Sequence, residues 1–197
     1  MDADIDSLVA RRVRDLRKAR ELSLDQLAEL SGVSRSTISL IERQETSPTA
    51  AVLNKLAGAL GSSLSSLFAD EPAGKPGGPL SRRADQGVWI DPASGYVRRQ
   101  VSPTVPGSPI DLVDVTFPAG ARVAFENVTR HVVTHQQVWI LAGEMEISVN
   151  DRSWRLRRGD CLAMVLGPQV VFSNPTRRPA RYALAITTSA SAARGPR

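Results

Sequence analysis

Residues Leu24–Glu42 read LDQLAELSGVSRSTISLIE, and this stretch decides the fold of the first third of the chain. Apolar residues recur every three to four positions on both sides of Gly32, which predicts two short helices joined by a tight turn. Glycine suits such a turn because a left-handed backbone conformation costs it little. Val33, Ile38 and Ile41 would bury the inner face of the second helix. Its polar face would then point outward, an arrangement that fits the DNA major groove.

Similar helical patterns flank this pair, one before it and two after it. Ser23 and Ser34 stand where N-terminal caps of the two central helices would be, and Gly61 follows the fourth helix. Five helices in roughly 65 residues predict a compact all-α domain.

The composition changes near residue 70. Residues 70–84 contain three prolines and three glycines, which predicts a linker that lets the flanking domains re-orient. Short alternating segments at 8–12-residue spacing follow, which indicates a β-sandwich or barrel. The expected organisation is therefore a two-domain α + β protein. Its parts are a helical domain at 1–69, a linker at 70–84, a β domain at 85–190 and a disordered tail at 191–197.

Charge and composition restrict the function classes. The 197-residue chain has a net charge of +5. The first 70 residues hold 9 basic and 10 acidic side chains, so net charge alone does not mark the helical domain as a nucleic-acid binder. No apolar stretch reaches the roughly 20 residues of a membrane helix. One cysteine, Cys161, cannot form an internal disulfide and is expected to be buried. We therefore expect a cytoplasmic protein without a membrane segment.

The stretch from Leu8 to Phe68 resembles the Xre and phage-repressor family of helix-turn-helix domains. The resemblance implies an ion pair between Arg17 and Glu42. It also implies that the start of the recognition helix reads bases and that the following loop contacts phosphates. The DNA-binding residues implied in this way are Arg35, Ser36, Thr37, Ser39, Leu40, Arg43, Gln44 and Thr46.

The second half of the chain resembles the cupin family, whose fold is a double-stranded β-helix or jelly-roll barrel. The segments that carry the resemblance are Gln137–Met145, Arg158–Leu162 and Phe172–Pro175. Cupins of this type hold a metal through four residues. At the corresponding positions this sequence has Thr129, His131, Gln136 and Val170. Because a transition-metal site needs about three protein ligands, we expect no bound metal, no other cofactor and no catalytic residue.

A barrel without a metal can still hold a small molecule. The residues expected to line such an effector pocket are Arg122, His135, Gln137, Trp139, Met164, Phe172 and Tyr182.

These features predict a sequence-specific transcriptional regulator that is not an enzyme. The helical domain would bind a palindromic operator in double-stranded DNA as part of a homodimer. The cupin barrel would bind a small-molecule effector, dimerise, or do both. One alternative is a metal-dependent cupin enzyme, epoxidase- or dioxygenase-like, with a structural helical domain; the missing metal ligands disfavour it. Another is an adaptor that binds a second protein through the barrel.

Overall fold

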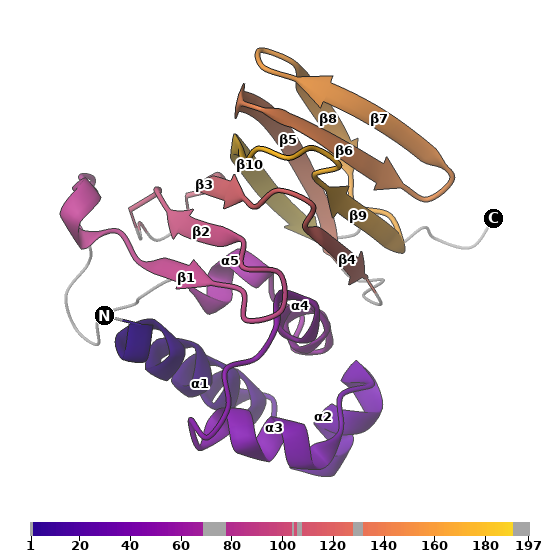
Figure 1. The fold of residues 1–197 in the computed structure, drawn as a ribbon. Helices are drawn as coiled ribbons and strands as arrows, with labels where there is room; N and C mark the ends of the chain where they lie inside the picture. Colours follow the sequence, from indigo (N-terminus) through magenta and orange to yellow (C-terminus); the bar gives the residue numbers. More distant parts are fainter. Residues whose placement is uncertain (1, 69–77, 104, 106–107, 128–131, 191–197) are drawn as a thin grey trace.

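The computed structural model describes residues 2–68, 78–103, 105, 108–127 and 132–190. Helices come first and strands follow, as the sequence predicts (Figure 1). The helices are α1 (Asp2–Ala19), α2 (Leu24–Ser31), α3 (Arg35–Glu42), α4 (Ala50–Ala59), α5 (Leu64–Leu67) and the short 3₁₀ helix η1 (Arg83–Asp85). The strands are β1 (Val88–Ile90), β2 (Val97–Gln100), β3 (Asp111–Phe117), β4 (Arg122–Glu126), β5 (Val132–Ala142), β6 (Glu144–Val149), β7 (Arg152–Arg157), β8 (Cys161–Val165), β9 (Gln169–Ser173) and β10 (Ala180–Ala190).

Capping residues and a glycine turn determine where the two helices of the helix–turn–helix begin and end. The Ser23 side chain accepts a hydrogen bond from the Gln26 backbone N–H, and the Gln26 side chain accepts one from the Ser23 N–H, so α2 begins with a capping box. Gly32 ends α2 in the left-handed conformation, with φ of 66°. Ser34 then caps α3 by accepting from the Thr37 N–H. The predicted turn between two short helices is confirmed.

The β domain consists of two antiparallel sheets packed face to face. The six-stranded sheet has the order β1-β2-β3-β10-β5-β8, and the four-stranded sheet has the order β4-β9-β6-β7. Gly143, with φ of 74°, joins β5 to β6, and a side chain there would meet the backbone of Pro179 and Ala180. The expected α + β architecture with a cupin-type barrel is confirmed.

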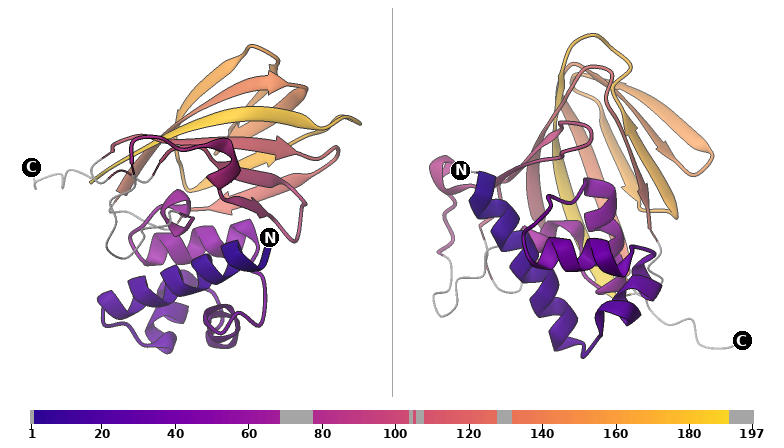
Figure 2. Two further views of the ribbon diagram at one scale, coloured as in Figure 1. Left: turned by 90° about the vertical axis from the view of Figure 1, so that its left-hand side faces the viewer. Right: turned by 60° about the horizontal axis from the view of Figure 1, so that its bottom comes forward.

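The helical domain lies directly against one end of the barrel (Figures 1 and 2). Helix α4 packs on β4, and α1 packs on β1. A run of neighbouring aromatic rings crosses the boundary from Phe68 through Trp89 to Tyr96, with centroids 5.2 and 5.8 Å apart. It continues into the barrel through Phe117. The buried residues of both domains therefore form one continuous core.

Polar contacts reinforce this docking. The Ala50 N–H, in the first turn of α4, donates to Asp91 Oδ1 at 2.8 Å, and Asp91 is buried between the domains. The Lys55 ammonium lies 2.7 Å from Glu126 Oε2. The domains of this structure are thus held together by specific contacts, although the sequence predicted a linker that lets them re-orient. Of that linker, residues 70–77 lie outside the described residues, as does the tail predicted at 191–197.

The expectation that Cys161 is buried is wrong. Cys161 is exposed, because it lies on the outer face of β8 opposite Trp139.

Within the described ranges, no helix combines the length and the apolar character needed to cross a membrane.

Candidate DNA-binding surface and interdomain cavity

Helix α3 presents a polar face and buries an apolar one. Ile38 and Ile41 are buried in the helical core. Arg35 and Ser36 are exposed at the start of the helix, and Thr37 is half-buried beside them. The hydroxyls of Ser36 and Thr37 lie 2.9 and 2.7 Å from Ser34 Oγ. A short polar helix start of this kind is what a recognition helix presents to base edges.

An ion pair fixes α3 against α1. Arg17 donates from Nε and Nη2 to the two carboxylate oxygens of Glu42, each at 2.7 Å, and from Nη1 to the Leu22 carbonyl. The two side chains are only 14% and 8% exposed. The hydrogen bond to Glu42 raises the pKa of the Arg17 guanidinium, so the pair stays charged. The pairing of Arg17 with Glu42, implied by the family resemblance, is confirmed.

The other predicted DNA-binding side chains surround this helix. Ser39 and Leu40 are half-buried farther along α3, whereas Gln44 and Thr46 are exposed in the loop after it. Arg43 ends the helix and lies 3.2 Å from Glu45.

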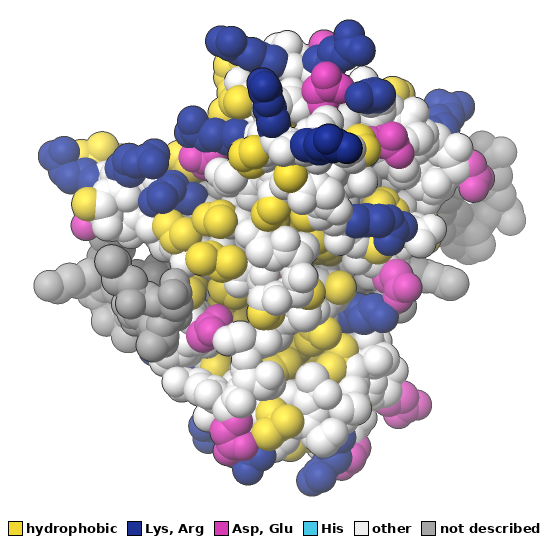
Figure 3. Space-filling model, in the orientation of Figure 1, with side chains coloured by type: hydrophobic (Ala, Val, Ile, Leu, Met, Phe, Trp, Pro, Cys, Tyr) yellow, Lys and Arg dark blue, Asp and Glu magenta, His cyan; other side chains and the backbone are white. Residues whose placement is uncertain are grey.

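The exposed cations of this surface have carboxylate neighbours. Arg35 Nε lies 3.2 Å from Asp25 Oδ1, and both side chains are largely in solvent. In Figure 3, Lys and Arg side chains alternate with Asp and Glu at the lower end of the molecule, where α2 and α3 lie. This mixture of positive and negative side chains agrees with the near-neutral charge of the helical domain.

Helix α1 adds basic residues to this surface; the sequence indicates Arg14 as part of a local basic face with Arg35 and Arg43, but not Arg11 or Lys18. Arg11, Arg14 and Lys18 follow one another at helical spacing and line a shallow surface concavity, to which Ser7, Asp15, Glu42 and Gln44 also contribute. Their spacing of three and four residues places them on one face of α1. That spacing is the signal that would have identified them from the sequence.

A cavity of about 110 Å³ lies where the helical domain closes the end of the barrel. Its floor and walls come from both sheets, and its cover comes from α4 and α5. A cavity needs only ~10–15 Å³ of such space to hold one water, so this one admits several waters or one small organic molecule. The apolar lining residues are Leu64, Val115, Phe117, Phe125, Leu166, Val170, Phe172, Leu184 and Ile186.

Several polar groups point into this apolar space. Arg98 is 4% exposed; its Nη2 donates to Ser65 Oγ of α5 at 2.5 Å, and its guanidinium lies 5.4 Å from the Phe68 ring centroid. Burial lowers the pKa of Arg98 and raises the pKa of Tyr96 and of Tyr182. At neutral pH both phenols therefore keep their protons and remain hydrogen-bond donors.

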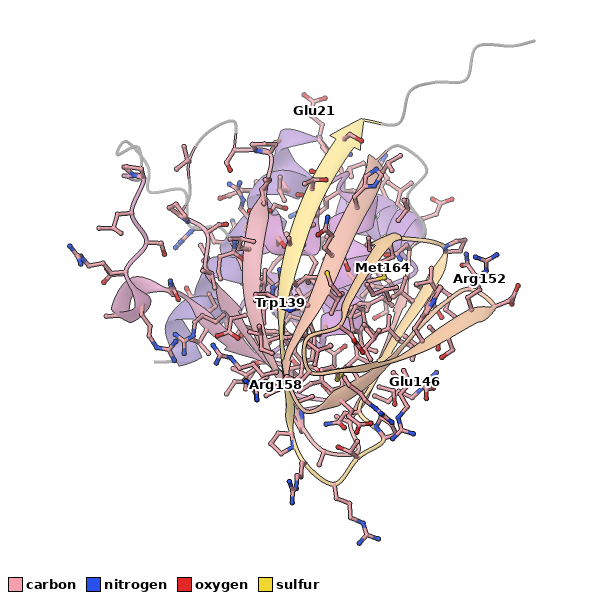
Figure 4. The ribbon with its side chains drawn as sticks, turned by 90° about the horizontal axis from the view of Figure 1, so that it is seen from above. Glu21, Trp139, Glu146, Arg152, Arg158 and Met164 are labelled. Atoms are coloured by element: carbon pink, nitrogen blue, oxygen red, sulfur yellow. The ribbon has the colours of Figure 1, made fainter. Side chains whose placement is uncertain are left out.

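The predicted effector-pocket residues have three different positions in the structure. Phe172 and Tyr182 line the cavity, and Met164 is buried between the sheets without lining it. The side chains of Arg122, His135, Gln137 and Trp139 are exposed and do not line it. Trp139 and Met164 are labelled in Figure 4, in the view from above the barrel. Arg98, Tyr96, Gln136 and Ser65 line the cavity and were missed.

The positions that hold metal ligands in cupins do reach this cavity, since Gln136 and Val170 both line it. An amide and an isopropyl group are not a ligand set for a transition metal. The described part of the chain contains no cluster of three His, Cys, Asp or Glu side chains. His131 and Thr129, at the other two positions, lie outside the described residues. The donor set at the described positions therefore does not fit a metal ion.

Part of the outer face of the six-stranded sheet is apolar, although His135, Gln137 and the Arg181–Asp114 ion pair lie on the same face. Leu112, Trp139 and Val165 are exposed there, with Trp139 at 52%. The strand register places Ala183 and Ala185 of β10 between them. We call this set of five residues the outer apolar face.

A capped helix–turn–helix with a locked recognition helix, docked on a cupin-type barrel, defines a DNA-binding transcriptional regulator. Residues 13–67 match the family HTH_3, described as helix-turn-helix. Over 65 residues the chain is 42% identical to the control protein C.SmaI of Serratia marcescens, covering 33% of this chain and 77% of that relative. The chain belongs to this Xre-like HTH_3 family.

Two further similarities extend over both domains. The chain is 29% identical over 167 residues to the HTH-type transcriptional regulator PuuR of Escherichia coli (strain K12), which covers 83% of this chain and 86% of the relative. The crystal structure of an HTH_3 family transcriptional regulator from Vibrio cholerae superposes on all of both chains with a TM-score of 0.75 at 24% identity. That likeness shows that the two-domain fold is shared.

Proposed function

We propose that this protein binds a palindromic operator as a homodimer and that its cupin barrel holds a small-molecule effector that controls DNA binding. The observation that carries the proposal is the locked recognition helix: Arg17 and Glu42 hold α3 so that its polar start faces solvent. The similarity to a named transcriptional regulator over both domains supports it. The proposal assigns no catalysis to the barrel.

Base reading is assigned to the start of α3. Arg35 and Ser36 are exposed and Thr37 lies beside them, so these three side chains would reach base edges, with Ser39 and Leu40 behind them. A bidentate arginine–guanine contact is the commonest base-specific contact in the major groove.

Phosphate contacts are assigned to the rim of this surface. Arg43, Gln44 and Thr46 follow α3, and the Arg11, Arg14 and Lys18 row runs along α1 beside Gln44. Such contacts fix the register of the protein on DNA and carry no sequence information.

The dimer contact is assigned to the outer apolar face. Exposed apolar patches that include a large aromatic side chain are typical of protein interfaces. A two-fold operator requires a second copy of this chain, and a sheet face that mixes one bulky Trp139 with small alanines can pack on itself. Trp139→Glu is expected to convert dimer to monomer in sedimentation experiments and to weaken operator binding. Leu80→Glu, which changes an exposed leucine outside this face, is the matched control.

The DNA assignment is tested by affinity selection of the purified protein on genomic fragments at about 0.15 M salt, where non-specific binding is suppressed. Enrichment of a few fragments that share a two-fold-symmetric motif is the expected result. On the selected site, Arg35→Ala should weaken binding by about 1–3 kcal/mol and relax specificity at one base pair. Arg43→Ala should weaken all sequences alike. If both variants lose only non-specific affinity, the recognition-helix assignment is wrong.

A further inference from the structure

Arg98 is a buried cation without a direct ion-pair partner among the described residues. No Asp or Glu of the described residues forms an ion pair with it; Asp111, half-buried nearby, is the acidic group that acts on it electrostatically. Its Nη2 has Ser65 as partner, and its Nε has none within the described parts of the chain. Burying an unpaired charge is strongly unfavourable, so a chain that needed only a packed barrel would place an apolar residue here.

The groups around Arg98 are arranged as an anion site. The two tyrosine side chains, Tyr96 and Tyr182, line the same cavity, and no hydrogen bond of either hydroxyl is found within the described ranges. Gln136 is half-buried and lines the same cavity; its amide NH2 group can donate to an anion, whereas its buried Oε1, which has no partner among the described residues, can only accept. No Asp, Glu, Lys or His is among the described residues that line the cavity, so its formal charge is that of one guanidinium.

We propose that the effector is a small organic monocarboxylate that binds in this interdomain cavity with its carboxylate on Arg98. The proposal rests on the effector-binding role proposed above and names its chemical class. One carboxylate balances one guanidinium and accepts its parallel N–H groups, as arginine–carboxylate pairs do. A phosphate with two charges would leave one of them buried and unbalanced. The apolar walls formed by Phe117, Leu184 and Ile186 would cover the organic part.

The same site touches both domains. Ser62, Ser63 and Ser65 of the helical domain line the cavity opposite Arg98, which itself lies on β2 of the barrel. A carboxylate on Arg98 would therefore sit against the Arg98–Ser65 contact that joins the domains. Ligand affinity would depend on how the helical domain is docked, which is the requirement for control of DNA binding.

The test uses the full-length purified protein labelled with isotope in tyrosine. Tyr96 and Tyr182 are the two tyrosines of the chain, and both line the cavity, so each ring signal reports on this site. The probes are acetate, butyrate and benzoate, with butyramide and benzamide as neutral analogues of the last two. Butylamine is the cationic analogue, and inorganic phosphate is the dianion. Ionic strength is held constant with sodium chloride.

The expected result is a saturable shift of both tyrosine signals and a rise in Tm with butyrate or benzoate concentration, without a matching response to the amides, the amine or phosphate. Arg98→Met should weaken carboxylate binding by about 10- to 100-fold, the usual range for a lost hydrogen-bonded charge. The substitution removes a buried charge that has no direct ion-pair partner among the described residues, and with it the contacts to Ser65 and Phe68; since these effects oppose each other, its Tm without ligand should change little. Arg99→Met, the neighbouring arginine on the opposite side of β2, is the matched control and should bind as the unaltered protein does.

Other outcomes separate the two proposals. Equal binding of carboxylate and amide, or unchanged carboxylate binding by Arg98→Met, would overturn the chemical class while leaving an effector site in place. A response to butylamine alone would do the same. If no probe of any charge shifts the tyrosine signals and the protein still selects an operator, effector binding fails together with the carboxylate assignment, and the DNA assignment stands. If Arg98→Met does not fold, Arg98→Lys takes its place. Lysine keeps the positive charge but loses the two parallel N–H donors that a guanidinium presents to a carboxylate. Unchanged butyrate affinity in that variant would also contradict the proposal.

Discussion

Asp91 is the side chain on which the docking of the two domains depends most directly, and Asp91→Ala tests this. Its Oδ1 accepts from the buried Ala50 N–H at 2.8 Å, and its Oδ2 accepts from the backbone and hydroxyl of Ser94. Removing the carboxylate leaves the Ala50 N–H unpaired and takes a negative charge from the N-terminus of α4. A hydrogen bond to a charged group contributes ~1.5–3 kcal/mol to stability. A favourable charge at a helix terminus contributes up to ~2 kcal/mol. We therefore expect the free energy of unfolding to fall by about 2–4 kcal/mol.

The assay is equilibrium unfolding in urea followed by two signals. All three tryptophans, Trp89, Trp139 and Trp154, belong to the barrel, whereas the α-helices belong to the helical domain. Tryptophan fluorescence and helical circular dichroism therefore report on different domains. In the unaltered protein the two transitions should coincide, because the domains share one core. In Asp91→Ala the helical signal should be lost at lower urea concentration than the fluorescence signal.

Two controls sharpen this experiment. Asp91→Asn keeps an oxygen that can accept from Ala50 but loses the charge, so its effect should be about half as large. Asp85→Ala removes an exposed carboxylate of η1 and should change little. A loss of less than about 0.5 kcal/mol in Asp91→Ala, within the range of ordinary surface substitutions, would refute the reasoning. Separate transitions in the unaltered protein would refute it as well.

Three further predictions concern other parts of the molecule. Glu42→Ala leaves the mostly buried Arg17 without its carboxylate partner and should lower the free energy of unfolding by about 2–4 kcal/mol in the same urea assay. The double variant Arg17→Met with Glu42→Leu, which removes both charges, should recover most of this loss. Asp25→Asn removes the carboxylate beside Arg35 and should raise affinity for any duplex about two- to fivefold by fluorescence anisotropy; an unchanged affinity would mean that Asp25 faces away from DNA. Burial raises the pKa of Tyr96 and Tyr182 in the folded protein, so the stability that depends on their neutral form is complete below about pH 10 and is lost as pH rises above it. Tyrosinate absorbance should then appear only together with unfolding, and its appearance in the folded protein near pH 10 would contradict this prediction.

The helix–turn–helix could be predicted because its determinants are local. Ser23, Gly32 and Ser34 each act on residues within four positions along the chain, so their roles can be identified from adjacent sequence. The ion pair between Arg17 and Glu42 spans 25 residues, and it followed from the family resemblance and not from the residue pattern.

The predicted pocket residues of β5 do not line the interdomain cavity, for a simple geometric reason. Successive side chains of a strand point to opposite faces, so an error of one residue moves every side chain to the other side. His135, Gln137 and Trp139 were expected inside, but Gln136, Val138 and Ile140 are the residues that point inward. The sequence already contained a hint, because Gln136 occupies a position that holds a metal ligand in cupins.

Arg98 could not be identified from the sequence at all. It stands in the run Val97–Gln100, where two adjacent arginines suggest a solvated strand. Its burial depends on Phe68 and Ser65, which lie more than 25 residues away in a different domain. A cavity built from two domains leaves no periodic signal in either one.

The position of the cavity gives effector control a short physical route. Helix α4, which covers the cavity, packs on α2, and α2 packs on the recognition helix α3. A two-fold operator fixes the separation of the two recognition helices in a dimer. If the barrels pair through the outer apolar face, that separation is set by how each helical domain docks on its own barrel. On the proposal made above, a carboxylate on Arg98, against its contact with Ser65, would bind the docked arrangement and any other arrangement unequally, because Ser65 belongs to one domain and Arg98 to the other. The proposed ligand would then shift the spacing of the recognition helices, and operator affinity with it, without any change inside the helix–turn–helix itself.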